Sequence, residues 1–298
     1  MTSTPEQTEV EQLRKALATT QKSLDRSRAE FRRQLEVAAK VHRTLLPEPA
    51  RHERLLVDTR YIPIENVGGD YCQVRFPNPD TCYITMCDVP GHGIAPALLA
   101  TRVSSEVRHF ILDNAAPHEI VRELNKFIYG HFEETGLYLT FIAARIDLGQ
   151  RLITWSGAGH PSPFLIRHQS ETIDLLESQN TVVGAFDRVL GDEPQHTLGL
   201  EPGDRLLFYT DGLTEAADPS GCLLGTDGLA GISRRTLPCD LFSMADQILN
   251  QVGLFSRGAF DDDMTVIVAD VRSAPAQIGS PPESVGKFLE IPSYETES

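Results

Sequence analysis

Apolar residues recur at every seventh position through the first part of the chain. Residues 6–46 contain neither glycine nor proline. The repeat runs through Val10, Leu17, Leu24, Phe31, Ala38 and Leu45. This spacing predicts a long helix with the spine of a coiled coil. The companion series is interrupted by Thr20, Ser27 and Gln34, so we expect weak or regulated self-association. A solvated single helix is the alternative, but a long apolar stripe favours dimerisation or docking.

The helical pattern ends at Leu46-Pro47, since proline restricts the residue before it and cannot continue a helix. We therefore predict three parts, namely a regulatory helix (1–49), a folded domain (50–272) and a tail (273–298). The tail contains many prolines, serines and glutamates and reads as disordered. Within it, Phe288, Leu289 and Ile291 form a candidate docking motif.

Between residues 55 and 271, short β-branched or aromatic runs alternate with turn residues, and a few helical stretches interrupt them. The predicted strands are 55–62, 70–76, 81–88, 138–147, 151–156, 162–167, 171–175, 205–210 and 264–271. The predicted helices are 94–112, 117–133, 226–235 and 239–254. Many strands with few helices indicate an α+β fold.

Composition narrows the function classes. The 298 residues carry a formal net charge of −15, which disfavours a nucleic-acid backbone or an anionic membrane as partner. The five cysteines are scattered without a CxxC pair, which argues against a disulfide framework and a zinc site. We find no secretory h-region and no run long enough to cross a membrane, so we expect a cytoplasmic protein.

Four aspartates flank apolar runs in similar contexts: Asp70 in VGGDY, Asp88 in MCDVPGHG, Asp211 in YTDGL and Asp262 in FDDDMTVIV. Any one of them alone reads as a turn residue. Together they predict one metal site, because converging carboxylates repel unless a cation neutralises them. Oxygen ligands suit Mg²⁺ or Mn²⁺, and a pair of such ions generates a nucleophile from bound water.

The order of the motifs resembles the metal-dependent protein phosphatase family (type 2C-like), specifically the bacterial branch of stage II sporulation protein E and the sigma-factor regulatory phosphatases. The motifs are LEVAAKVHRTLLPEP, VGGDYCQV, DVPGHGIAPALLA, SGAGHPSPFLI, YTDGLTEA and DDDMTVIVA. The resemblance covers about residues 36–271. It implies a β-sandwich of two antiparallel sheets with helices on both faces and the metal centre at one edge.

The resemblance also implies roles for single residues. Asp88 would bridge two Mn²⁺ or Mg²⁺ ions, and Asp70 would serve the same centre. Asp211 and Asp262 would complete the second metal's shell, with the backbone carbonyl of Val89 as a further ligand. Asp261 and Asp263 flank Asp262, and only the motif selects among the three.

Two histidines are candidate general acids, His92 and His160, because histidine titrates near neutral pH. His92 is displaced from the comparable family position, and His160 in AGHPSP also suits a structural turn. Two residues depart from the family pattern. Gln73 replaces an acidic residue, which we expect to weaken metal binding nearby, and Pro90 stiffens the loop after Asp88.

Three functions remain open. The first is a serine/threonine phosphatase that acts on a phosphorylated regulator, such as an anti-anti-sigma factor. The second is a catalytically weakened scaffold that holds a partner through its coiled coil. The third is a metal-dependent hydrolase of small phosphoesters, which the absence of a P-loop or dinucleotide fingerprint disfavours.

Overall fold

Alternating apolar and polar runs fold into two antiparallel sheets in the computed structural model, which describes residues 5–64, 67–91, 93–188 and 195–273. One sheet has the order β3-β4-β5-β6-β9, and the other has the order β1-β2-β11-β10-β7-β8. The strands of the first sheet are β3 Tyr71–Asn78, β4 Thr81–Asp88, β5 Thr140–Asp147, β6 Leu152–Ala158 and β9 His196–Gly199. Those of the second are β1 Ala50–His52, β2 Leu55–Ile62, β7 Phe164–Ile166, β8 Ile173–Leu175, β10 Arg205–Tyr209 and β11 Met264–Val271.

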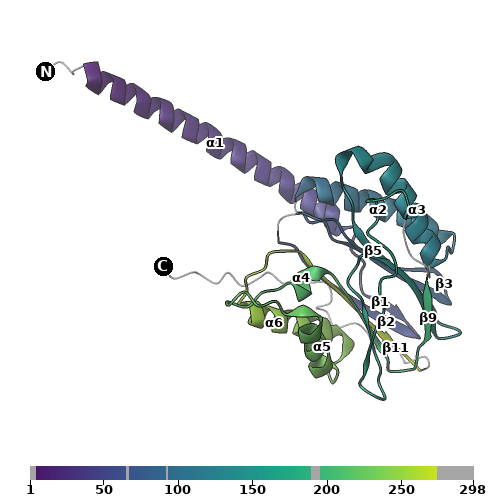
Figure 1. The fold of residues 1–298 in the computed structure, drawn as a ribbon. Helices are drawn as coiled ribbons and strands as arrows, with labels where there is room; N and C mark the ends of the chain where they lie inside the picture. Colours follow the sequence, from purple (N-terminus) through teal and green to yellow (C-terminus); the bar gives the residue numbers. More distant parts are fainter. Residues whose placement is uncertain (1–4, 65–66, 92, 189–194, 274–298) are drawn as a thin grey trace.

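Helices cover the outer face of each sheet, so the domain has four layers (Figure 1). α2 (Ile94–Leu112) and α3 (Pro117–Phe132) lie on the first sheet, and η1 (Glu133–Thr135) extends α3. α5 (Gly225–Thr236) and α6 (Leu241–Ser256) lie on the second sheet, next to the short α4 (Asp211–Thr214). Three apolar cores follow, one between the sheets and one beneath each helical pair. This confirms the α+β sandwich.

The sequence predicted the long elements well. The bounds of β2, β4, β11 and α2 are those predicted, and α3, α5 and α6 shift by one or two residues at their ends. The strands β1 and β9, the short α4 and the single turn η1 were not predicted. β1 and β9 have only three and four residues, all partly or fully exposed, and owe their structure to strand pairing instead of an apolar pattern.

α1 (Pro5–Arg43) projects from the domain, and only its last turns touch it (Figure 1). There Leu35 and Ala39 pack against Val67 and Ala97. The predicted helix is confirmed, and part of its apolar series is exposed, with Leu17 at 67% and Phe31 at 53%. Among the helices of the described residues, none combines the length and apolar character that a membrane span needs.

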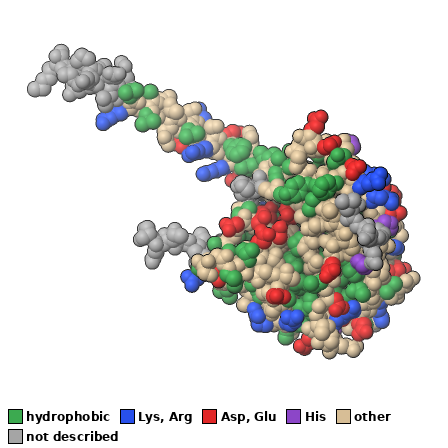
Figure 2. Space-filling model, viewed as in Figure 1, with side chains coloured by type: hydrophobic (Ala, Val, Ile, Leu, Met, Phe, Trp, Pro, Cys, Tyr) green, Lys and Arg blue, Asp and Glu red, His purple; other side chains and the backbone are tan. Residues whose placement is uncertain are grey.

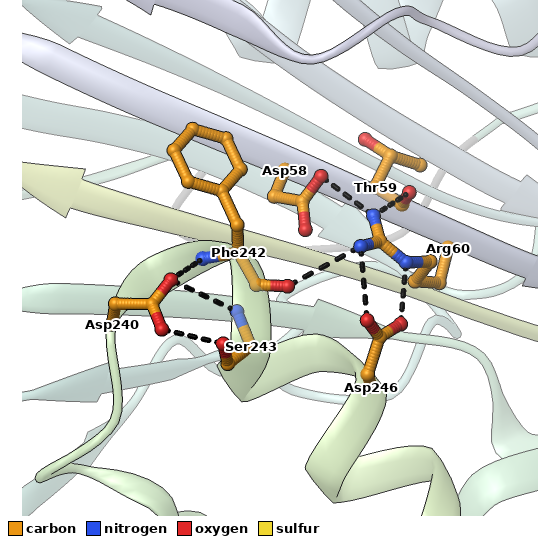
Figure 3. A network of polar contacts seen from close by, with 7 residues as sticks. All are labelled: Asp58, Thr59, Arg60, Asp240, Phe242, Ser243 and Asp246. Carbon is orange, nitrogen blue, oxygen red and sulfur yellow. Dashed lines mark hydrogen bonds and ion pairs between the residues drawn. The ribbon is translucent and has the colours of Figure 1, made fainter. Parts of the chain in front are cut away.

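A buried ion-pair network ties β2 to α6 (Figure 3). Arg60 donates from Nη1 to Asp58 and from Nε to Asp246, each over 2.6 Å, and from Nη2 to the carbonyl of Phe242. Asp58 is fully buried, and burial raises the pKa of its carboxyl while Arg60 lowers it. Asp240 caps α6 by accepting from the backbone of Phe242 and Ser243.

Removing Arg60 should therefore destabilise the fold strongly. Arg60→Ala leaves Asp58 buried without its cation, and we expect a loss of about 3–5 kcal/mol in the free energy of unfolding. Arg54→Ala is the matched control, since its ion pair with Asp80 is exposed and contributes less than about 1 kcal/mol. Urea denaturation at neutral pH measures both, and equal losses would contradict this reading.

Candidate metal centre

Antiparallel pairing brings the four predicted aspartates to one edge of the sandwich. Asp70 directly precedes β3 and Asp88 ends β4, and these two strands pair with Tyr71 opposite Cys87. Asp211 follows β10 and Asp262 precedes β11, and these two pair with Tyr209 opposite Val266. Each sheet thus contributes two carboxylates to the same edge, because neighbouring antiparallel strands end and begin together.

Asp70 is the most deeply placed of the four, with 2% of its surface exposed. Its Oδ2 accepts from the hydroxyl of Thr210 over 2.8 Å and from the hydroxyl of Thr265. Burial, followed by the charges of Asp88 and Asp263, raises its pKa well above the ordinary value, while the two hydroxyls lower it. The second sheet therefore fixes an aspartate that belongs to the first.

Asp88 and Asp211 are repelled by the same two acidic neighbours, Asp262 and Glu215. Burial, then the charges of Asp211, Asp262, Asp263 and Glu215, raise the pKa of Asp88 to about 7. Burial, then Asp262 and Glu215, raise the pKa of Asp211 to about 6. Figure 2 shows acidic side chains gathered on the surface beneath the base of α1. The four aspartates thus lie in one electrostatic cluster.

No lysine or arginine of the described residues compensates the charge of the cluster. Within the described part of the chain, none of Asp70, Asp88, Asp211 and Asp262 forms an ion pair with lysine or arginine, and the charges that shift the first three are carboxylates. No three His, Cys, Asp or Glu side chains of that part converge closely enough to hold one ion. The donor set fits a hard divalent cation in its chemistry, since it consists of oxygens whose mutual repulsion such an ion relieves.

Asp263, the neighbour of Asp262, joins the loops of the site. Its Oδ1 accepts from the backbone of Ile64 over 2.8 Å, and its Oδ2 from the hydroxyl of Tyr61 over 3.5 Å. A Cβ on Gly68 would lie 1.5 Å from that carboxylate, and a Cβ on Gly212 would lie 2.1 Å from the Asp263 carbonyl. Both positions require glycine. Asp263 thus holds these loops together, while the charge of Asp262 acts on Asp88 and Asp211.

Glu215 was not predicted, although a signal for it was present. It follows Asp211 by four residues in the motif YTDGLTEA, which places it one helical turn further along at the end of α4. Its charge raises the pKa of both Asp88 and Asp211. It is therefore a further acidic member of the cluster.

The loop after Asp88 lies close to the loop before Asp70. The backbone of Val89 donates to the carbonyl of Gly69 over 3.3 Å, and a Cβ on Gly69 would lie 2.2 Å from the Val89 oxygen. Only glycine permits this approach, which puts the Val89 carbonyl between the two aspartate loops. Pro90 follows on the surface and makes no described hydrogen bond in this loop.

The two candidate histidines differ in what the structure reports. His92 lies outside the described residues. His160 is 3% exposed, its Nδ1 lies 2.8 Å from the hydroxyl of Thr140, and burial lowers its pKa to about 3. Thr140 pairs with Asp88 across β4 and β5. His160 is therefore a neutral core residue beside the site, which favours the structural reading over that of a general acid.

The contacts of Gln73 differ from those expected of a residue that weakens metal binding. It is 2% exposed, and its Nε2 donates to the carbonyl and the hydroxyl of Ser104 on α2 over 2.8 and 3.0 Å. Its Oε1 accepts from Arg75 over 2.6 Å. Strand alternation puts Gln73 on the same face as Tyr71, beneath α2, and Asp70 on the other face. Gln73 thus bonds to α2 and to Arg75 and not to the carboxylate cluster, so its contacts give no support to the expected weakening of metal binding.

Comparison with known proteins identifies a family model and two relatives that the sequence matches. Residues 78–272 match the family model described as stage II sporulation protein E. The phosphoserine phosphatase RsbP of Bacillus subtilis is 29% identical over 187 residues, which cover 62% of this chain and 46% of RsbP. The phosphoserine phosphatase RsbU of the same organism is 24% identical over 240 residues, covering 80% of this chain and 70% of RsbU. The chain thus spans about half the length of RsbP and more of RsbU.

Comparison with solved structures places the fold. The SiaA-PP2C domain of Pseudomonas aeruginosa superposes with a TM-score of 0.72 at 20% identity. The alignment covers 83% of this chain and 99% of that domain. Helices on both faces of two antiparallel sheets are therefore the arrangement of a PP2C-type domain.

The repulsion within the cluster predicts a pH-dependent stability. Because the folded protein raises the pKa of Asp88 to about 7, it binds that proton more tightly than the unfolded chain, so stability falls as pH rises from 4 to 7. In a chelating buffer, Asp88→Asn should gain about 2 kcal/mol over the unaltered chain at pH 7.5 and little at pH 4.5. Urea denaturation at both pH values measures this. Asp261→Asn, an exposed neighbour of the cluster, serves as the control, and a gain that does not change with pH would refute the explanation.

Proposed function

The chain belongs to the stage II sporulation protein E family, and from that premise we propose that it is a metal-dependent serine/threonine protein phosphatase. The observation that carries this proposal is that Asp70, Asp88, Asp211 and Asp262 come from both sheets to one edge, where no lysine or arginine of the described residues pairs with them. Such an arrangement costs folding free energy. A binding role for divalent metal accounts for its presence.

Two Mn²⁺ or Mg²⁺ ions are the cofactors that this donor set suits. We assign Asp88 as the central residue, with Asp70, Asp211, Asp262 and the carbonyl of Val89 completing the set that would hold them. Bound there, the ions would supply a water of lowered pKa for in-line attack at phosphorus and would neutralise charge on the phosphoryl group.

The chain's own residues orient these ligands. The hydroxyls of Thr210 and Thr265 hold one oxygen of Asp70 and leave the other for a ligand role. Asp263 holds the loop of Ile64 and Gly68 against the start of β11. His160 is neutral and buried, so the proton that the leaving serine oxygen needs comes from solvent or from a group other than His160.

The substrate that we propose is phosphoserine or phosphothreonine on a regulatory protein of the anti-anti-sigma type. RsbP and RsbU are described as phosphoserine phosphatases, and both are similar to this chain. Asp211 and Asp262 are partly exposed and Glu215 is exposed, so a phosphorylated side chain on a folded protein can reach this end of the cluster. The scaffold alternative depended on Gln73 weakening metal binding. Its contacts do not support that effect, because Gln73 lies beneath α2.

We extend the proposal to a homodimer that forms through the predicted regulatory helix. α1 exposes Leu13, Leu17, Leu24 and Phe31 at 63%, 67%, 44% and 53% of their surfaces. We propose that two copies pair through this stripe, because burying it from water stabilises a coiled coil. Leu35 and Ala39 continue the same stripe at helical spacing and pack on the domain, so the part available for pairing lies before them.

Loss of one central ligand should abolish turnover. Asp88→Asn removes a charge from the centre of the cluster, and we expect Mn²⁺-dependent release of phosphate from a phosphoserine protein to fall by at least about 10³-fold. Asp261→Asn changes an adjacent exposed carboxylate in the same way and should retain activity within about twofold. A phosphate-release assay across Mn²⁺ concentrations decides this. If the Asp88→Asn protein retains activity, or a nucleotide panel is hydrolysed faster than the phosphoprotein, the proposal fails.

The helix pairing has its own test. Replacing Leu24 and Phe31 together by Asp puts charge in the stripe, and the protein should sediment as a monomer where the unaltered chain is a dimer. Arg26→Asp with Arg33→Asp introduces the same residue type on another face of α1 and should leave the mass unchanged. Sedimentation equilibrium at micromolar concentration measures the mass. A monomeric unaltered chain would exclude the homodimer.

A further inference from the structure

A groove of about 520 Å³ lies on the helical layer remote from α1, between α5 and the last turns of α6. One wall of the groove is a side of α5, where six residues follow one another at helical spacing. They are residues 224, 227, 228, 231, 232 and 235. Gln251, Leu254 and Phe255 of α6 form the other wall. Leu254 is 69% exposed, so the groove presents apolar surface to solvent.

The floor of the groove is open at Gly231, which lacks a side chain. At Gly228 the Leu224 side chain fills the space, 2.6 Å from where a Cβ would lie. Gly228 and Gly231 lie one turn apart on α5. A Cβ on Gly231 would have only the Arg235 guanidinium within 4 Å, at 3.6 Å. A side chain from another segment therefore has room over this turn.

Opposite charges stand at the two ends of the groove. Asp227 and Arg235 are separated by eight residues of helix, or about 12 Å along its axis. Both are exposed, and neither has an ion-pair partner among the residues that the structure describes. The groove thus suits a short segment with an apolar side chain between a basic and an acidic residue.

The chain carries such a segment in its own tail. Lys287, Phe288, Leu289, Glu290 and Ile291 stand in this order. In an extended conformation Lys287 and Glu290 are about 10 Å apart, close to the separation of Asp227 and Arg235. Because successive side chains of an extended segment alternate in direction, Phe288 would then point into the groove over Gly231 and Leu289 away from it. The long side chains of Lys287 and Glu290 would reach the charges along its rim. The rest of the tail is rich in proline and serine and offers no second apolar run of this kind.

The tail can reach the groove. The structure describes the chain as far as Ser273, just beyond the end of β11. Arg205 joins this end to α5, because it pairs with Asp270 and donates to the carbonyl of Leu237 over 3.0 Å. α5 has 12 residues and is about 18 Å long. The 14 residues from Ser273 to Lys287 span up to about 46 Å, which is more than enough.

We propose that residues 287–291 of the tail dock in the groove between α5 and α6 of the same chain, with Lys287 at Asp227 and Glu290 at Arg235. This assignment is independent of the proposed phosphatase activity. It does place the tail near the acidic cluster, because Leu224 of the groove donates from its backbone to the carbonyl of Ala216, just after Glu215.

A zero-length carbodiimide cross-link on the full chain tests the proposal. The reagent joins Lys287 to Asp227 only where the amine and the carboxylate touch, and peptide mass spectrometry should find this link. Gly231→Leu fills the groove and should lower the yield about fivefold or more. Gly130→Leu, on α3 with nothing within 4 Å of its Cβ position, is the matched control and should leave the yield unchanged.

Charge exchange and isotope mixing complete the test. Arg235→Glu should lower the yield of the link, and adding Glu290→Arg should restore it, because the pair is then reformed with opposite signs. An equal mixture of ¹⁵N-labelled and unlabelled protein should give links within one chain. Mixed-isotope links would assign the segment to a second copy and overturn the proposal, and so would the absence of any Lys287–Asp227 link in the unaltered chain.

Discussion

Repulsion between carboxylates at one edge of the sandwich is the constraint on which the rest of the structure depends. Asp88 and Asp211 carry pKa values raised to about 7 and about 6 because burial and other acids disfavour their charge. A flexible loop would relieve such strain by moving apart. Here strand pairing on both sheets forbids it, and two threonine hydroxyls hold Asp70 across the sandwich. The edge therefore stores an unfavourable charge arrangement that the cores beneath each helical layer must outweigh.

That constraint explains which residues around the edge are small and which are polar. Gly68 and Gly212 leave space for Asp263, whose carboxylate and carbonyl lie where their side chains would be. Asp263 in turn accepts from Ile64, so the segment before Asp70 is fixed by the segment before β11. Asp263 thus positions the loops of the site and, together with Asp262, contributes charge to it. A substitution at either position would disturb the same cluster for different reasons.

The sequence predicted the sandwich because long strands and helices bury one face, and that periodicity is visible without coordinates. β4 and α2 are examples, each found with its predicted bounds. Convergence of the four aspartates was also predictable, since each flanks an apolar run. What the sequence did not reveal depends on partners distant along the chain. Gln73 is satisfied by Ser104 on α2, His160 by Thr140, and β9 exists only through its pairing with β6. No local pattern reports such contacts, so the roles expected of Gln73 and His160 differ from those their surroundings favour.

The base of α1 and the groove on α5 connect to the site through different sheets, and this arrangement has a consequence for control. The last turns of α1 pack on Val67 and Ala97, which flank the loops of Asp70 and Asp88 on the first sheet. The groove on α5 is bonded through Leu224 to the segment after Asp211, on the second sheet. Each of these two surfaces is therefore coupled to one pair of carboxylates. Because Thr210 and Thr265 link Asp70 to the second sheet, a displacement of either pair changes the repulsion that the other pair experiences. Occupancy of the coiled-coil stripe and occupancy of the groove would then be linked through charge at the edge, with no direct contact between the two segments required.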